Sequence, residues 1–428
     1  MEEMKRYDSY KDSGIEWIGE IPSHWAVSRI KYYLDYQKSK NPKEINFDKG
    51  STSEIYLAMD FLRGEPRQIL YVDDTDGYVK VDENEILLLW DGSNAGEFIL
   101  SKRGILSSTM AVIYLDNIKK RYSWYYLKNF EPRLKENTIG MGIPHVNGEE
   151  LKNGYITIPP ISEQTSIASF LDRKTAEIDE LIADKKRLLE LYEEEKTAII
   201  NQAVTKGLDP NVPMKDSGIE WLGEIPEHWE VKKVKHVMKS LNSIRVPLSS
   251  EERGKMIKRE YDYFGASGII DKVESYLFDE PLLLIGEDGA NLITRNSRLS
   301  FIARGKYWVN NHAHILSPTF GVLEYYCEIM EICDYTIWIS GSAQPKLTSD
   351  NLMNIEIVVP PIQEQQLIVH HIESECSKID FKKARTEELI ELLTEYRTAL
   401  ISEVVTGKIK VTENCENNKG ASQYHQDH

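Results

Sequence analysis

The chain contains one fifteen-residue stretch twice. KDSGIEWIGEIPSHW begins at Lys11 and KDSGIEWLGEIPEHW begins at Lys215, which lies 204 positions later; the copies differ only at Ile18/Leu222 and Ser23/Glu227. A repeat at this spacing indicates two structural units of similar size that need the same local scaffold. A chain of 428 residues is also too long for one ordinary hydrophobic core. We therefore expect two comparable halves.

A second motif repeats further along each half. PPISEQ begins at Pro159 and PPIQEQ begins at Pro360, 201 positions later, and each precedes a charged stretch of roughly 40 residues without Gly or Pro. A double proline ends a strand and favours a helix start soon after it. The sequence therefore predicts a long helix after each motif, the first of which ends near Gly207 and the second near Gly407.

The apolar residues of both stretches recur close to the seven-residue period of a coiled-coil seam, so the two helices are expected to pack against each other. Two independent surface helices, each lying on its own domain, remain the alternative. The expected seam consists of Leu171, Ile178, Leu188, Leu189, Tyr192 and Ile199 in the first helix and Ile372, Ile379, Leu389, Ile390, Leu393 and Leu400 in the second.

These features predict an α+β protein with two mixed α/β globular domains and two long helices. The expected segments are a first domain at 1–160, a central helix at 161–208, a second domain at 209–359, a distal helix at 360–409 and a polar, disordered tail at 410–428.

Positions that the halves share are interpreted as scaffold. The repeated His24-Trp25 and His228-Trp229 pairs are expected to be packing anchors, because a buried Trp usually serves as a large apolar contact. Tyr125-Tyr126 is matched with Tyr325-Tyr326, and Pro144 with Pro345.

Positions that the halves change are candidates for DNA contacts. Arg with Asn or Gln reads guanine and adenine edges, while Lys and Ser bind phosphates. The first half offers Arg63, Arg67, Gln68, Ser93, Asn94, Lys102 and Arg103. The second offers Arg245, Arg253, Lys255, Arg295, Asn296, Arg298, Arg304, Lys306, Gln344 and Lys346. Runs of charge are more often solvated faces, which is the alternative for each of these residues.

Composition and missing signatures argue against catalysis by this chain. There is no P-loop, dinucleotide fingerprint, Asn-Pro-Pro-Tyr methyltransferase signature or HExxH zinc motif, and the four cysteines form no CxxC pair. His312-Ala-His314 is interpreted as ordinary polar surface, because catalytic zinc needs three protein ligands. We expect neither catalytic nor metal-binding residues. No apolar run is long enough to cross a membrane and the N-terminus has no apolar signal core, so a cytoplasmic protein is expected.

The net charge of −17 opposes a simple DNA binder, which is expected to be basic. It is compatible with DNA binding only where local patches and partner proteins supply positive charge.

The duplicated opening motif and the PPIxEQ helix starts together resemble the DNA specificity subunit of type I restriction-modification enzymes. The resemblance covers about Lys11 to Lys408. It implies that each globular domain is a target recognition domain and that the helices form an antiparallel coiled coil. It also implies a split, asymmetric double-stranded DNA target and, as partners, two methyltransferase subunits and restriction/translocase subunits. S-adenosylmethionine, Mg²⁺ and ATP would belong to those partners, with no cofactor in this chain. A single-chain nuclease or methyltransferase and a coiled-coil scaffold without DNA readout remain alternatives.

Overall fold

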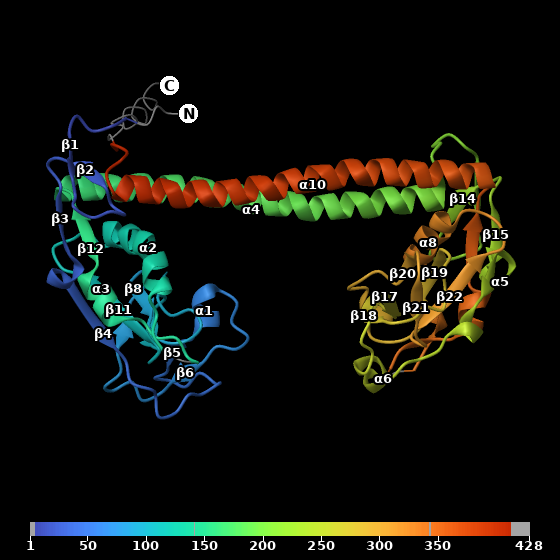
Figure 1. Ribbon diagram of the computed structural model, residues 1–428, viewed down its shortest axis with the longest axis horizontal. Coiled ribbons are helices and arrows are strands. Elements are labelled where there is room, and N and C mark those ends of the chain that lie inside the picture. Colours follow the sequence, from blue (N-terminus) through green and yellow to red (C-terminus); the bar gives the residue numbers. More distant parts are fainter. Residues whose placement is uncertain (1–4, 141, 342–343, 412–428) are drawn as a thin grey trace, which may run out of the picture. The chain divides into compact units, whose positions relative to one another are not determined.

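The computed structural model describes residues 5–140, 142–341 and 344–411. The chain divides into two compact units (Figure 1): unit 1 lies within Met1–Lys185 and Glu388–His428, and unit 2 is Lys186–Glu387. Each unit thus takes in its own globular domain and part of both long helices. Most of the tail expected at 410–428 lies outside the described residues.

Unit 1 is built on an antiparallel sheet of order β4-β11-β8-β9. These strands are β4 (Leu34–Lys38), β8 (Ile86–Leu89), β9 (Phe98–Leu100) and β11 (Met110–Leu115), and a second sheet of order β6-β5-β10-β7 consists of β5 (Glu54–Leu57), β6 (Tyr71–Val72), β7 (Lys80–Val81) and β10 (Gly104–Leu106). Leu88 packs with helix α2 (Lys120–Glu136), and Leu87 packs with the second sheet. Strand β8 is buried on both faces, which explains why its sequence is continuously apolar.

Unit 2 repeats this arrangement with the sheet β16-β22-β19-β20. Its strands are β16 (Met238–Ser240), β19 (Leu282–Gly286), β20 (Ser300–Ala303) and β22 (Ala313–Pro318), and a second sheet of order β18-β17-β21 consists of β17 (Tyr261–Gly265), β18 (Gly268–Val273) and β21 (Tyr307–Val309). Helix α8 (Leu323–Ile332) packs on Leu283 of β19, whereas Leu284 faces the second sheet. The prediction of two mixed α/β domains is confirmed.

Smaller elements complete both units. Unit 1 has β1 (Tyr10–Asp12), β2 (Glu20–Pro22), β3 (Ala26–Arg29), β12 (Tyr155–Ile158), α1 (Met59–Arg63) and α3 (Gly148–Asn153). Unit 2 has β13 (Met214–Asp216), β14 (Glu224–Pro226), β15 (Glu230–Lys233), β23 (Ile339–Ser340), β24 (Lys346–Leu347), β25 (Glu356–Val359), α5 (Val234–Val237), α6 (Ser250–Gly254), α7 (Asn291–Thr294) and α9 (Ser349–Asn354). Strand β3 pairs with β12, and β15 pairs with β25, so the strand after each opening motif is hydrogen-bonded to the strand before each double proline.

The two repeated motifs are repeated because they contact each other. Glu163, at the start of helix α4 (Ile161–Lys206), accepts hydrogen bonds from Trp25 Nε1 at 3.0 Å and pairs with His24 Nε2 at 2.6 Å. Glu364, at the start of helix α10 (Ile362–Val405), pairs with His228 Nε2 at 2.8 Å. Trp25 and Trp229 are both fully buried, so their interpretation as packing anchors is confirmed.

The glutamine of each PPIxEQ motif fixes a second helix. Gln164 Oε1 accepts from the backbone N–H of Lys119 at 2.8 Å, which precedes α2. Gln365 Oε1 accepts from Val322 N–H at 2.9 Å, which precedes α8. Both side chains also donate to the first proline carbonyl of their motif. A side-chain acceptor at a helix start satisfies a backbone donor that has no partner within the helix.

Each unit also binds the carboxyl end of one long helix. Gly407 and Gly207 share a φ of +76°, which only glycine adopts without strain. A Cβ on Gly407 would collide with Pro22 and press on Trp25, and one on Gly207 would press on Trp229. The helices end at Val405 and Lys206, so the predicted ends near Gly407 and Gly207 are confirmed.

The tyrosine matching predicted from sequence is wrong. Tyr122 donates to the carbonyl of Val405 at 3.2 Å, and Tyr325 donates to the carbonyl of Val204 at 3.4 Å, so Tyr122 is the counterpart of Tyr325. The Tyr-Tyr pair in α2 lies one helical turn further on than the pair in α8. The identical Tyr-Tyr pairs suggested an alignment of the two helices that the hydrogen bonds contradict.

Segments of α4 and α10 pack antiparallel within each unit. In unit 1, Leu171 and Ile178 share a core with Leu400, and Arg397 pairs with Asp179 at 2.8 Å. In unit 2, Lys196 pairs with Asp380 at 2.9 Å. This is the equivalent contact, because Lys196 and Arg397, like Asp179 and Asp380, are 201 positions apart.

Burial differs among the predicted seam positions. Ile372 and Ile379 are buried, and Leu188, Leu189, Tyr192, Ile199, Ile390 and Leu393 are half-buried. The prediction that Leu389 lies in the seam is wrong, because its side chain is 38% exposed. The buried residue of that turn is Thr386. Thr386 completes the seven-residue series from Ile379 to Leu393. Its hydroxyl donates to the Lys382 carbonyl, so this polar residue can be buried although the apolar pattern does not include it.

The two tryptophans allow a direct test of the Glu163 hydrogen bond. In the described part of the chain Trp229 Nε1 is buried and has no partner. Trp25→Phe and Trp229→Phe remove the same atoms, but only the first removes a hydrogen bond. We expect Trp25→Phe to lower the free energy of unfolding of its unit by about 1 kcal/mol more than Trp229→Phe. Hydrogen exchange of β3 and β15 measures this, and equal effects would contradict it.

Candidate nucleic-acid interface

Each unit has the same backbone corner at the end of its central buried strand. An Asp-Gly turn follows β8 in unit 1 and β19 in unit 2. The N–H of Gly92 donates to the Pro144 carbonyl at 2.9 Å, and the N–H of Gly289 donates to the Pro345 carbonyl at 3.0 Å. Pro144 therefore corresponds to Pro345, as predicted.

Further backbone bonds dock the segment after each proline. Val146 N–H donates to the Trp90 carbonyl and Leu347 N–H donates to the Glu287 carbonyl, both at 2.8 Å. The next residue in each case caps a short helix: Asn147 accepts from the start of α3, and Thr348 accepts from the start of α9. The two corners, one in each unit, therefore have the same backbone arrangement, held by the same hydrogen bonds.

In unit 1 the corner carries an aromatic and cationic stack. Tyr36 stacks on Trp90 with ring centroids 5.2 Å apart, and Lys38 Nζ lies 3.9 Å from the Trp90 ring centroid. Burial lowers the pKa of Lys38, and the nearby Asp91 carboxylate partly offsets this. Asp91 also pairs with His145 Nδ1 at 2.6 Å.

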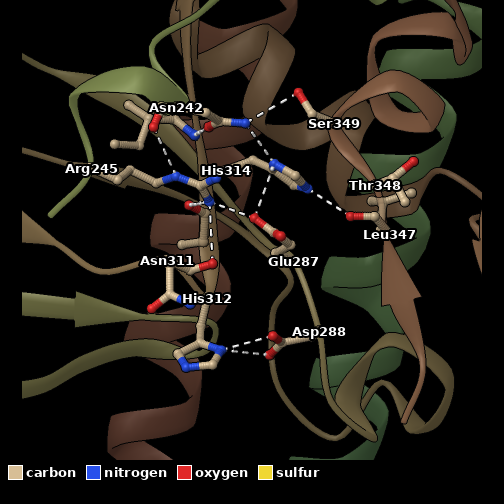
Figure 2. A network of polar contacts seen from close by, with 12 residues as sticks. Asn242, Arg245, Glu287, Asp288, Asn311, His312, His314, Leu347, Thr348 and Ser349 are labelled. Carbon is tan, nitrogen blue, oxygen red and sulfur yellow. Dashed lines mark hydrogen bonds and ion pairs between the residues drawn. The ribbon is translucent and has the colours of Figure 1, made fainter. Parts of the chain in front are cut away.

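In unit 2 a buried carboxylate stands where unit 1 has Trp90. Figure 2 shows Glu287 directed at Arg245 and His314, and Glu287 also pairs with Lys346 at 3.1 Å. Arg245 donates in addition to the carbonyls of Asn311 and Ala313.

A second layer of hydrogen bonds fixes this network. Asn242 Nδ2 lies 2.9 Å from His314 Nδ1 and donates to Ser349 Oγ, while His314 Nε2 bonds to the Leu347 carbonyl. Nearby, His312 pairs with Asp288 at 2.7 Å.

The electrostatics of Glu287 keep it ionised. Burial would raise the pKa of its carboxyl, but the hydrogen bond from Arg245, the electrostatic interaction with His314 and the hydrogen bond from Lys346 outweigh burial, so the pKa lies below its usual range. Burial also lowers the pKa of His314, against the opposing effects of its bond to Leu347 and the Glu287 charge. The complete burial of His314 contradicts its interpretation as polar surface, which holds only for the exposed His312.

The corners present hydrogen-bonding side chains on a backbone frame that is held by hydrogen bonds. Among the described residues no group of three His, Cys, Asp or Glu side chains could hold a metal ion. Polar side chains on loops held by a scaffold suit recognition of DNA edges and phosphates.

The predicted DNA-contact residues of the first half fall into two classes. Arg63 pairs with Glu97 at 2.9 Å, and Lys102 donates to the Phe61 carbonyl at 2.8 Å, so both brace the α1 region. Within residues 5–140, five others are exposed and their side chains make no hydrogen bond or ion pair: Arg67, Gln68, Ser93, Asn94 and Arg103. These five remain available for a ligand.

The arginines of the basic run in the second half contact helix α8 or the residue after it, two of them as ion pairs. Arg298 pairs with Glu328 at 2.8 Å, Arg304 pairs with Glu324, and Arg295 donates to the carbonyl of Glu331 at 3.0 Å. These contacts could not be predicted from the sequence, because the residues of α8 that make them lie 20 to 36 positions further on. The DNA-contact prediction for these arginines stays a prediction.

The remaining candidates in unit 2 divide in the same way. Arg245 and Arg253 are mostly buried in ion pairs, and Lys255, Lys306 and Lys346 are exposed ion-pair partners of Glu251, Asp279 and Glu287. In the described part of the chain the exposed side chains of Asn296 and Gln344 make no hydrogen bond or ion pair.

Sequence reasoning missed Trp90, His145, Asn242 and Glu287 as members of the corners. The available signal was the pair of matched prolines, which lie 201 positions apart like the helix motifs. Following that offset would have set His145 against Lys346 and Ile143 against Gln344.

Comparison with known proteins agrees with this duplicated architecture. The family model described as "Type I restriction modification DNA specificity domain" matches residues 22–191 and again 226–391. The specificity subunit of the type I restriction enzyme MjaVIII from Methanocaldococcus jannaschii is 30% identical over 91% of this chain and 94% of that relative. The EcoBI specificity subunit of Escherichia coli is 20% identical over 84% of this chain and 80% of its own length.

A solved structure supports the fold. A chain from a study of complex assembly and conformational transition of the type I R-M system matches 91% of this chain and 99% of its own length, with a TM-score of 0.61 at 14% identity. The double match of the family model and the relative at 30% identity lead to one conclusion. The chain belongs to the family of type I restriction-modification DNA specificity proteins.

Proposed function

We propose that this chain is the DNA specificity subunit of a type I restriction-modification complex and that each unit reads one half of a split, asymmetric target. The observation that carries the proposal is the pair of corners: one backbone scaffold, held by the same hydrogen bonds, bears different side chains in the two units. Equal scaffolds suit equal partners, and unequal side chains suit unequal half-sites.

The matched contacts between the opening motif and the start of a long helix, which occur once in each unit, also support two copies of one partner. The contacts of His24 with Glu163 and of His228 with Glu364 recur in the two units with nearly the same geometry. We assign one modification (methyltransferase) subunit to each unit and place restriction subunits further out in the complex. S-adenosylmethionine, Mg²⁺ and ATP are assigned to those subunits, and a cytoplasmic location follows from the need to reach double-stranded DNA.

No helix of the described chain is long and apolar enough to cross a membrane. The acidic total is compatible with DNA binding when the partners contribute most phosphate contacts, which dominate affinity.

The test is methylation mapping in a host that expresses this chain with its modification subunit. We expect methylation confined to one bipartite sequence, and its complete loss when the chain is omitted. Methylation that is unchanged without the chain, or that has no sequence preference with it, would contradict the proposal.

A further inference from the structure

Each corner exposes one side chain immediately before its proline. Ile143 in unit 1 is 62% exposed, and Gln344 in unit 2 is exposed as well. Ile143 and Gln344 are equivalent because the backbone pairs in the same way around both. Ile139 pairs with His145, and Ser340 pairs with Lys346; each residue of the second pair lies 201 positions after its counterpart in the first.

The backbone on the carboxyl-terminal side of Ile143 and Gln344 is held by hydrogen bonds. The proline carbonyl accepts from the Asp-Gly turn, and the residue after the proline is paired across the segment and bonded through its side chain, His145 to Asp91 and Lys346 to Glu287. A residue next to such an anchor has a defined direction and loses little conformational entropy when it binds.

Packing does not explain either side chain. Ile143 belongs to none of the apolar cores of the described residues, and Gln344 makes no side-chain hydrogen bond there. An exposed isoleucine beside glycines Gly140 and Gly142, both at positive φ, gains nothing from the fold. Both side chains are therefore free to meet a ligand.

The two side chains differ in chemistry, which agrees with the two different half-sites of the proposed target. A glutamine amide can donate and accept together, which matches the N6 and N7 groups of adenine in the major groove. An isoleucine offers only apolar contact, which suits the thymine methyl group. The neighbouring exposed Lys346 can meet a phosphate.

We propose that the residue before the corner proline, Ile143 in unit 1 and Gln344 in unit 2, contacts a base edge and determines specificity at one position of its half-site. The inference rests on the proposed function and adds the residues that distinguish the two readings. The proline scaffold sets the position, and the side chain in front of it sets the preferred base.

The test is methylation mapping of Gln344→Ile and Ile143→Gln, each expressed with its modification subunit. Gln344→Ile is expected to change or relax one position of one half-site, with at least a tenfold loss of preference there, as expected when about 1–3 kcal/mol of discrimination is removed. Ile143→Gln should alter one position of the other half-site. In each variant the opposite half-site should keep its sequence.

Ile257→Gln is the matched control, because Ile257 is also an exposed isoleucine, at 93%, and lies on the loop after α6, outside the segments that make the corner contacts described above. It should leave both half-sites unchanged. Full methylation of the original sequence by both corner variants would overturn the inference while leaving the proposed function intact. Failure of the unmodified chain to direct any sequence-specific methylation would instead overturn the proposed function.

Discussion

Leu400→Gln is expected to destabilise unit 1 by about 4 kcal/mol, whereas Leu392→Gln should change its stability by less than about 0.5 kcal/mol. Both leucines lie on α10 within unit 1, but Leu400 is 2% exposed and Leu392 is 54% exposed. The first substitution removes a buried side chain and buries an unpaired amide, each of which costs on the order of 2 kcal/mol. The second changes a solvated face.

Glutamine is the better probe than glutamate here. Leu392 is surrounded by Glu388, Glu391 and Glu395, so a new carboxylate would add repulsion that has nothing to do with packing. Leu and Gln also have similar helix propensities, so the two variants differ mainly in burial. Hydrogen exchange of the Glu388–Val405 segment, together with denaturant titration, measures the effect. Equal losses in both variants would contradict the packing of α10 against α4 in unit 1.

Sequence patterns predicted the features that depend on local chemistry. The double prolines at Pro159 and Pro360 marked helix starts within two residues, because proline restricts the backbone whatever its surroundings. Gly207 and Gly407 marked the helix ends for a similar reason, since their positive φ excludes other residues. The repeat itself announced two units.

The features that depend on distant partners could not be predicted in the same way. The ion pair of Arg298 with Glu328 could not be predicted, because the packing of β20 on α8 brings together two residues that lie 30 positions apart. Leu389 fits an apolar seam by spacing, but the seam follows Thr386, whose hydroxyl bonds within its own helix. The sequence also did not reveal that each unit includes the carboxyl end of one long helix.

Replacement of residues 11–159 by the same segment of another family member is expected to change one half-site completely. The side chains that differ between the corners belong to their own units, so the second half-site should persist. The inserted segment must keep the counterparts of Trp25, Tyr122 and Thr157, because Gly407 packs on Trp25 and the Val405 carbonyl accepts from the other two.

A matched control exchanges the same segment but substitutes the counterpart of Tyr122 by Phe. It removes one hydroxyl that bonds to Val405 and leaves every corner residue in place. We expect it to lower stability by about 1 kcal/mol and to leave the new half-site as it is. A changed sequence preference in this control would mean that the contact of Tyr122 with the end of α10, and not the corner, affects which DNA sequence is recognised.

The most direct measurement of the central claim is the methylated sequence of the exchanged chain, expressed with the original modification subunit and compared with that of the unmodified chain. Two units that read independently predict one new half-site and one retained half-site in every methylated copy. Change in both half-sites, or in neither, would show that the two units do not read DNA separately.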